Sequence, residues 1–152
     1  MKSLITVFFL MLSLAGFSQN TEETEIKQTI TAFFEAFHKQ DSVALKKYVS
    51  KEMTLQSVIS DAQGEAKIKT TEFSAFLKSI VAIPKEVKFD ERILSVAVQS
   101  DGLMANAWTD YEFYINKKFS HCGVNSFQLV KENKVWKIFY IVDTRRTDCK
   151  KS

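Results

Sequence analysis

Residues 87–114 read VKFDERILSVAVQSDGLMANAWTDYEFY, two runs rich in β-forming residues on either side of Asp101-Gly102. Branched and aromatic residues favour strands. An Asp-Gly pair is a strong signal for a tight hairpin, because a type I′ turn needs positive φ at both central residues. The stretch therefore predicts two long antiparallel strands, and a turn centred on this pair places Ser100 opposite Leu103, Val98 opposite Ala105, Val96 opposite Ala107, Leu94 opposite Thr109 and Arg92 opposite Tyr111.

This register gathers apolar side chains on one face of the predicted sheet. The face comprises Leu94, Val96, Val98, Ala105, Ala107, Thr109, Tyr111 and Phe113. Several of these side chains are small, so the face is partly hollow, and we expect a pocket there. The opposite face carries Trp108, Asp110, Glu112 and Tyr114.

Two further strands follow this hairpin. Asn116-Lys117 turns the chain into residues 119–131, and Glu132-Asn133 turns it into residues 134–145, which makes an antiparallel meander. A two-residue turn at Asn116-Lys117 puts Phe127 on the Trp108 face, whereas a bulge or a three-residue turn puts it on the Tyr111 face. The sequence leaves this choice open.

Helical periodicity dominates the chain before residue 87. Apolar residues recur at intervals of three and four from Thr21 onwards, again over residues 43–49, and again over 73–81. Asp41 or Ser42 is suited to cap the second helix and Thr70 or Thr71 the third, which ends before Pro84. A short hairpin over residues 53–69 lies between them. The order of elements predicts an α+β domain with three N-terminal helices.

The first residues form a separate segment. Lys2 precedes an apolar run from Leu4 to Leu12, and small residues follow at Gly16 and Ser18. This pattern is typical of a secretory signal peptide, so we expect cleavage after residue 18, a mature domain over 19–152, and a periplasmic or secreted protein. A retained membrane anchor is the alternative; after cleavage we expect no membrane association.

The composition limits the kinds of partner that the protein can bind. The chain has 152 residues and a formal net charge of +3, with no long basic block that tracks a phosphate backbone. We therefore expect one domain and no nucleic-acid partner.

Three segments resemble a known family. These are AWTDYEFY at 107–114, HCGVNSF at 121–127 and VWKI at 135–138 with DTRR at 143–146. Together with the element order, they are similar to the NTF2-like superfamily, and more narrowly to its exported bacterial branch described as lumazine-binding or SnoaL-like. The resemblance implies a cone, formed by a strongly curved antiparallel sheet around the three helices, with a pocket at its open end and homodimers formed through the sheet.

The resemblance also directs the search for catalytic groups. Related isomerases and cyclases place a carboxylate on the first strand, but residues 53–59 contain no acid, and Glu52 and Asp61 beside them are expected to be solvated strand ends. His121 with Asp143 is the remaining acid–base candidate, and a purely structural histidine is the alternative. His38, on the polar side at the end of the first helix, is expected to be a favourable cation near the negative end of that helix.

Other residues are candidates for binding. The expected ligand-binding set is Arg92, Thr109, Tyr111, His121, Tyr140 and Arg145, and the expected dimer interface is Trp108, Tyr114, Phe139 and Ile141. Cys122 and Cys149 either form a disulfide or remain separate thiols. No metal motif occurs, so we expect no metal or cofactor.

These observations favour a noncatalytic, exported module that binds a small polar or aromatic ligand or a protein partner, as a homodimer. A SnoaL-like isomerase, cyclase or hydratase that uses His121 and Asp143 is the first alternative. A structural dimer with a cone filled by phenylalanine side chains is the second.

Overall fold

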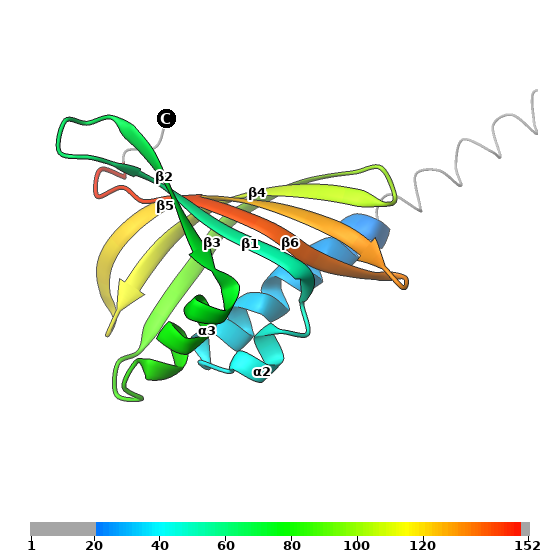
Figure 1. Cartoon of the computed structure of the whole chain (residues 1–152), viewed down its shortest axis with the longest axis horizontal. Coiled ribbons are helices and arrows are strands. Elements are labelled where there is room, and N and C mark those ends of the chain that lie inside the picture. Colours follow the sequence, from blue (N-terminus) through cyan, green and yellow to red (C-terminus); the bar gives the residue numbers. More distant parts are fainter. Residues whose placement is uncertain (1–20, 150–152) are drawn as a thin grey trace, which may run out of the picture.

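The computed structural model describes residues 21–149, and its helices all lie on one side of a curved sheet (Figure 1). The chain is helical over residues 21–38. The elements that follow are α2 (Ser42–Leu45), β1 (Val49–Ser60), β2 (Ala66–Glu72), α3 (Phe73–Ala82), β3 (Phe89–Ser100), β4 (Met104–Ile115), β5 (Lys118–Glu132) and β6 (Val135–Thr144). The expected α+β class is confirmed.

The six strands form one sheet in the order β2-β1-β6-β5-β4-β3. Strands β3 to β6 make the predicted antiparallel meander. The expectation of an entirely antiparallel sheet is wrong, because β1 runs parallel to β6, with Leu55 opposite Ile141. No hairpin links these two strands, since β2, α3, β3, β4 and β5 lie between them in the chain, and so nothing forces them to be antiparallel.

Three bulges in the meander of β3 to β6 decide which of its side chains face the helices. The extra residue is Leu94 in β3, Ser120 in β5 and Phe139 in β6, where the register with the neighbouring strand shifts by one. The alternation of side chains between the two faces reverses at each bulge. On one side of each bulge the odd-numbered residues of the strand face the helices, and on the other side the even-numbered residues do, or the reverse.

The bulge in β5 resolves the choice that the sequence left open. Asn116 and Lys117 both have positive φ, 49° and 66°, and form a two-residue turn. Ser120 then adds one residue, so that Phe127 pairs with Ala107. Phe127 is fully buried on the concave face, as the bulge alternative predicted.

The register predicted for β3 and β4 is wrong for two reasons. First, the N–H of Asp101 donates to the carbonyl of Met104 at 3.1 Å, so the turn is centred on Gly102 and Leu103, one residue later than expected. Of these two residues only Gly102 has positive φ, 94°, as at the first central position of a type II′ turn. Ser100 therefore pairs with Ala105.

The second reason is the bulge at Leu94. It turns the Leu94 side chain outward, where it is 55% exposed, and the apolar position is taken by Ile93, which packs against the core. Arg92 consequently pairs with Glu112 and not with Tyr111. Its neighbour Glu91 moves onto the concave face.

The helices differ from expectation in their ends. Asp41 caps α2 as predicted, accepting hydrogen bonds from the N–H groups of Val43 and Ala44, but the helix has only four residues. Neither Thr70 nor Thr71 caps α3 as predicted, because β2 continues to Glu72. The chain passes directly from strand to helix.

The core lies between the first helix and the concave face of the sheet. Its buried residues come from both layers and include Ile26, Ile30, Phe33, Leu45, Phe127, Leu129, Trp136 and Ile138. Each large side chain removed from water contributes roughly 1.5–3 kcal/mol. This burial fixes the helix within the curve of the sheet.

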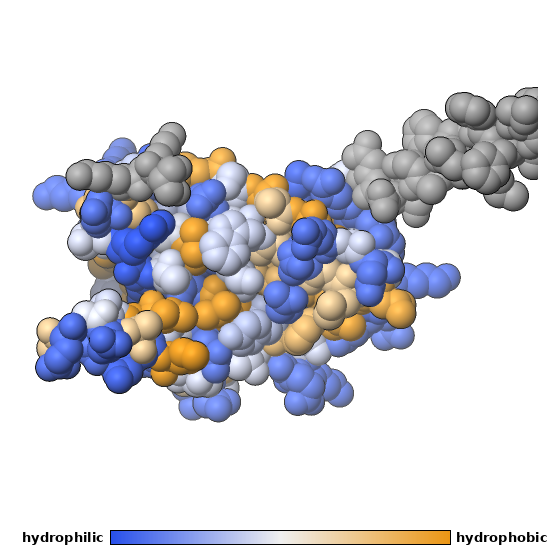
Figure 2. Space-filling view, turned by 90° about the horizontal axis from the view of Figure 1, so that it is seen from above, coloured by the Kyte–Doolittle hydropathy of each residue, from blue (hydrophilic) through white to orange (hydrophobic). Residues whose placement is uncertain are grey.

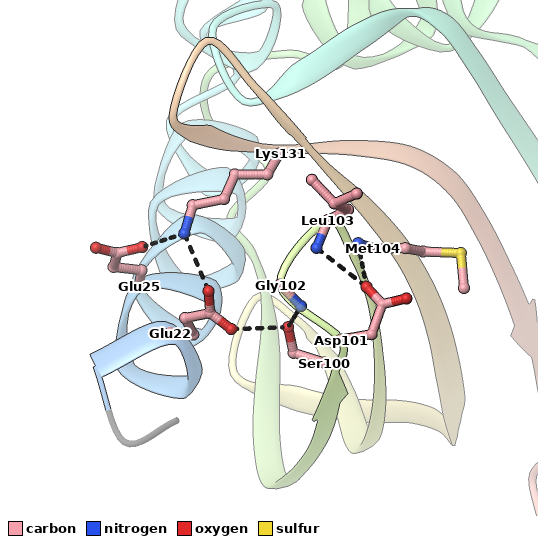
Figure 3. A network of polar contacts seen from close by, with 8 residues as sticks. All are labelled: Glu22, Glu25, Ser100, Asp101, Gly102, Leu103, Met104 and Lys131. Carbon is pink, nitrogen blue, oxygen red and sulfur yellow. Dashed lines mark hydrogen bonds and ion pairs between the residues drawn. The ribbon is translucent and has the colours of Figure 1, made fainter. Parts of the chain in front are cut away.

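A polar network joins the start of the first helix to the sheet (Figure 3). Lys131 of β5 reaches two acids of the first helix, Glu22 at 3.2 Å and Glu25 at 3.7 Å. Glu22 also accepts a hydrogen bond from Ser100 at the β3–β4 hairpin. The start of the helix is thereby tied to two hairpins, while the end of the helix borders the open part of the cone.

The predicted signal peptide, residues 1–18, lies outside the described residues. Among residues 21–149, no helix combines the length and apolar character needed to span a membrane.

Candidate functional site

Two neighbouring pockets lie between the helices and the concave face of the sheet, and we call them the small and the large lobe of the cavity. The small lobe has a volume of about 130 Å³ and is lined by residues that include Phe33, Phe34, Leu55, Asn125, Phe127 and Ile141. The large lobe has a volume of about 380 Å³ and is lined by residues that include Ile80, Ile83, Phe89, Tyr111, Phe113 and His121. Both lobes are bordered by Phe37, Phe76, Glu91, Asp143 and Arg145.

Glu91 of β3 is the most strongly perturbed acid in the cavity wall. Asn125 of β5 donates a hydrogen bond from Nδ2 to Glu91 Oε1 at 2.9 Å. Among the described residues, no hydrogen bond holds the other carboxylate oxygen, Oε2.

Burial raises the pKa of Glu91 from 4.5 to about 7. The hydrogen bond from Asn125 and the charge of Arg145 oppose this rise, and the nearby carboxylate of Asp143 adds to it. A carboxyl group with this pKa is present in both protonation states near neutral pH, as a general acid or base requires.

His38 supports the backbone beside this carboxyl group. The N–H of Glu91 donates to His38 Nε2 at 2.9 Å, so His38 accepts with a neutral ring. Burial lowers the pKa of His38, in agreement with this role. The expectation of a cationic histidine is wrong, because the bulged strand brings the Glu91 N–H to the His38 ring at the end of the first helix.

Asp143 and Arg145 form the second charged element between the lobes. Arg145 Nε donates to Asp143 Oδ2 at 2.8 Å, and Ser57 of β1 donates to Asp143 Oδ1. The side chain of Asp143 is 14% exposed and that of Arg145 is 59% exposed. Arg145 is therefore the charged group that the opening of the cavity presents to solvent.

His121 and Asp143, the predicted acid–base pair, border the same large lobe. Within the part of the chain that the structure describes, however, no hydrogen bond joins them. His121 Nδ1 lies 3.1 Å from Ser120 Oγ, and its ring stacks on Phe113 with centroids 4.8 Å apart. Burial and the charge of Arg145 lower the pKa of His121, which favours a neutral ring.

Tyr111 and Thr109 are the next two predicted ligand-binding residues. Tyr111 borders the large lobe, and its hydroxyl donates to the carbonyl of Thr144 at 2.9 Å. Thr109 is fully buried, and its Oγ1 accepts a hydrogen bond from Asn125 at 3.3 Å. Thr109 thus orients Asn125 and does not border either lobe.

Arg92 and Tyr140 are placed away from the cavity, so the binding role expected for them is wrong. Arg92 lies on the outer face of the sheet, with its guanidinium 4.0 Å from the centre of the Tyr114 ring. Tyr140 lies one residue beyond the bulge at Phe139, and its hydroxyl donates to Gln56 at 2.6 Å. In both cases a bulge reverses the phase of the alternation on which the prediction relied.

The chain at the end of β6 runs close alongside β5 at Gly123. A Cβ atom there would overlap the backbone carbonyl of Thr144, so only glycine permits this close approach. Cys122 and Arg146 exchange two backbone hydrogen bonds, 2.9 and 2.8 Å, and a disulfide joins Cys122 to Cys149. Arg145 is held between these fixed points.

The predicted dimer residues have different environments. Trp108 is 51% exposed on the outer face, and Tyr114 and Phe139 are partly buried. Ile141 is 7% exposed within the core, so its assignment to a dimer interface is wrong. The bulge at Phe139 turns Ile141 inward, toward Leu55.

The sequence analysis missed Glu91, Asn125 and Ser57. Glu91 follows no motif, and simple alternation from Val96 puts it on the outer face. Only the bulge at Leu94 moves it inward. Asn125 and Ser57 are polar residues within apolar strands, a weak signal that becomes useful once their faces are known. No group of acids, histidines and cysteines suited to hold a metal occurs among residues 21–149.

Comparisons with known proteins agree with this architecture. The family model described as SnoaL-like domain matches residues 26–143. No curated protein matches the sequence significantly.

Three solved structures illustrate the likeness of fold. A protein of unknown function from Mycobacterium tuberculosis has a TM-score of 0.68 and 13% identity, covering 85% of this chain and 74% of that one. A protein from Streptomyces avermitilis, named as a candidate dehydratase of the NTF2-like family, has a TM-score of 0.65 and 14% identity, covering 84% and 98%. A candidate scytalone dehydratase from Novosphingobium aromaticivorans has a TM-score of 0.64 and 11% identity, covering 86% and 88%.

The cone, its cavity and the extent of the family match lead to one assignment. The chain belongs to the SnoaL-like domain family, and its fold is the one seen in NTF2-like proteins.

Proposed function

We propose that the cone binds a small, largely apolar organic ligand with a carbonyl or hydroxyl group, and that Glu91 exchanges a proton with this ligand. The chain would then be an acid–base enzyme of the isomerase or dehydratase type. The observation that carries the proposal is the Glu91 carboxyl group, held by Asn125 in an otherwise mostly apolar cavity.

The lining of the cavity supports the class of ligand. Phenylalanine side chains from the first helix and α3 face aliphatic side chains of the sheet, and the charged groups common to both lobes, Glu91, Asp143 and Arg145, form one belt. An apolar cavity with a few placed polar groups is typical of small-molecule sites. A flat or aromatic body fits these walls, with its polar group toward Glu91.

Glu91 supports a proton-transfer step. As a carboxylate, its free Oε2 takes a proton from the carbon next to the ligand's carbonyl, and the electron pair of that C–H bond moves to give an enolate. The proton then returns to the same or another carbon. The guanidinium of Arg145 supplies positive charge near this belt, where it stabilises the developing oxyanion.

The proposal departs from the noncatalytic function that the sequence favoured, and it replaces His121 as the base. The perturbed pKa of Glu91 supports this change, as do two fold relatives that are named as candidate dehydratases. Ligand binding without reaction is the competing outcome, and one experiment separates the two.

The experiment measures hydrogen–deuterium exchange next to a carbonyl. Phenylacetone and 1,3-diphenylacetone are incubated with the protein in D₂O, and loss of the CH₂ signal is followed by proton NMR. We expect exchange above the buffer rate, at least 100-fold slower in Glu91→Gln and partly retained in Glu91→Asp. Glu86→Gln, an exposed site outside the cavity, is the matched control. Binding without exchange by the native protein would contradict catalysis and leave a binding function.

We further propose that the protein is exported and acts as a homodimer through the outer face of the sheet. The Cys122–Cys149 disulfide supports export, since such bonds persist in oxidising compartments. Apolar side chains gather along the middle of the outer face, with hydrophilic side chains around them (Figure 2). Cell fractionation of the full chain, followed by native mass spectrometry, tests both points.

A further inference from the structure

The two lobes of the cavity differ in size but share one polar border. Glu91, Asp143 and Arg145 lie on the sheet side of this border, and Phe37 and Phe76 lie on the helix side. The rings of Phe37 and Phe76 are stacked, with centroids 5.9 Å apart. The shared residues place the two lobes side by side, so a ligand that occupied both would lie across this border.

Each lobe has its own aromatic wall. In the small lobe, Phe34 packs edge-on against Phe33 and Phe127, at 5.7 and 5.9 Å between centroids. In the large lobe, Phe89 stacks on Phe113 and Phe113 on His121, at 6.0 and 4.8 Å. Ring-sized apolar groups fit both walls, because aromatic faces and edges complement one another.

The volumes indicate that the lobes act together. Pockets for small molecules usually measure about 300–1,000 Å³, and the small lobe, at about 130 Å³, is below this range. It holds one ring-sized group and not a whole ligand. The large lobe, at about 380 Å³, has room for the remainder.

We propose that the ligand is an elongated molecule with two ring-sized apolar ends on either side of a central carbonyl or hydroxyl group. One end occupies each lobe, and the centre faces Glu91, Asp143 and Arg145. This inference concerns the same site as the proposed function and rests on its ligand-binding part. It specifies the shape of the ligand, which the acid–base role of Glu91 leaves open.

Two ketones provide the test. 1,3-Diphenylacetone has two phenyl groups around a central carbonyl, and phenylacetone has one. Dissociation constants are measured by calorimetry, with the protein titrated into the ketone. We expect 1,3-diphenylacetone to bind the native protein at least 10-fold more tightly.

Two substitutions fill one lobe each. Thr71→Trp fills the small lobe from β2, and Ser79→Trp fills the large lobe from α3. Thr71 is partly buried and Ser79 is exposed, so neither substitution disturbs the core. Each substitution is expected to weaken the binding of 1,3-diphenylacetone at least 10-fold. It should weaken the binding of phenylacetone less than 3-fold, because the one ring of phenylacetone can still occupy the lobe that is not filled.

Matched controls place the same residue just outside the cavity. In Thr70→Trp the new side chain is on the opposite face of β2 from Thr71. In Lys78→Trp it is beside Ser79, on the exposed side of α3. Neither should change the affinity for either ketone by more than 2-fold. Circular dichroism and melting temperature are compared for all four variants, and only variants that match the native fold enter the comparison of affinities.

The outcomes separate the two proposals. If only one tryptophan variant weakens 1,3-diphenylacetone, if the two ketones bind equally, or if neither ketone binds, the two-lobed ligand is wrong. If the binding of 1,3-diphenylacetone requires both lobes but its CH₂ protons do not exchange, the two-lobed ligand stands and the catalytic role of Glu91 is wrong. If phenylacetone exchanges its CH₂ protons in a Glu91-dependent way, but filling one of the lobes has no effect on the binding of 1,3-diphenylacetone, the catalytic proposal stands and the two-lobed ligand is wrong.

Discussion

Asn125 Nδ2 lies 2.9 Å from Glu91 Oε1, although the two residues are on strands separated in the sheet by β4. The curvature of the sheet brings the side chains together on the concave face, and Thr109 on the strand between them holds the amide at 3.3 Å. This contact stabilises the charged form of Glu91, because the amide N–H donates to the carboxylate.

Removing the amide should therefore raise the pKa of Glu91 further. In Asn125→Ala we expect the midpoint of the Glu91 titration, followed by carbon NMR of the side-chain carboxyl group, to move upward from about 7. Asn106→Ala, on the outer face of β4, should leave the midpoint unchanged. A downward shift in Asn125→Ala would show that the amide does not stabilise the carboxylate.

The stability of the protein should depend on the protonation of Glu91. The pKa is about 7 in the folded state and 4.5 as the ordinary value, so the folded state retains this proton over a range in which the unfolded chain has lost it. Folding stability from this residue is therefore fully present below pH 4.5 and is lost progressively as the pH rises to about 7.

Glu91→Gln removes the free-energy cost of burying a charged carboxylate at high pH. At pH 8 we expect the variant to be more stable than the native protein by an amount on the order of 3 kcal/mol, and at pH 4 the two should be nearly equal. Urea denaturation at both pH values measures the difference. An equal effect at both pH values would contradict the assignment, and Glu86→Gln serves as a control for the loss of one surface charge.

The disulfide should stabilise the C-terminal segment and, with it, Arg145. Cys122 and Cys149 are 27 residues apart, and closing a loop of this length stabilises the folded state by roughly 3–4 kcal/mol. The variant with both cysteines replaced by serine should lose about this amount in urea denaturation. Dithiothreitol should destabilise the native protein and not the variant, and an equal response of both would argue against the bond.

The proposed dimer makes Trp108 a sensitive position. Its indole is 51% exposed on the outer face, so Trp108→Lys should leave the fold intact and introduce a charge into an apolar contact. Light scattering after gel filtration should then give a monomer mass for the variant and a dimer mass for the native protein. Leu103→Lys, exposed at the tip of a hairpin, is the control, and a native monomer would contradict the proposal.

Much of the fold follows from local patterns in the chain. Helical spacing from Thr21 to Phe37 and alternation through the long strands are set by which residues are apolar, and burial of those residues drives the packing. Asn116-Lys117 forms a tight turn for the same local reason, because both residues adopt positive φ. The family resemblance carried by residues 107–146 then predicted the cone correctly.

The site depended on features that alternation does not encode. A bulge at Leu94 moves Glu91 inward and Arg92 outward, and a bulge at Phe139 moves Ile141 inward and Tyr140 outward. A bulge changes the phase of every side chain beyond it, and its position is chosen by how the curved sheet packs on the helices. The order of residues determined the helices, strands and family of this protein, while tertiary packing alone decided which charged side chains meet in the cavity.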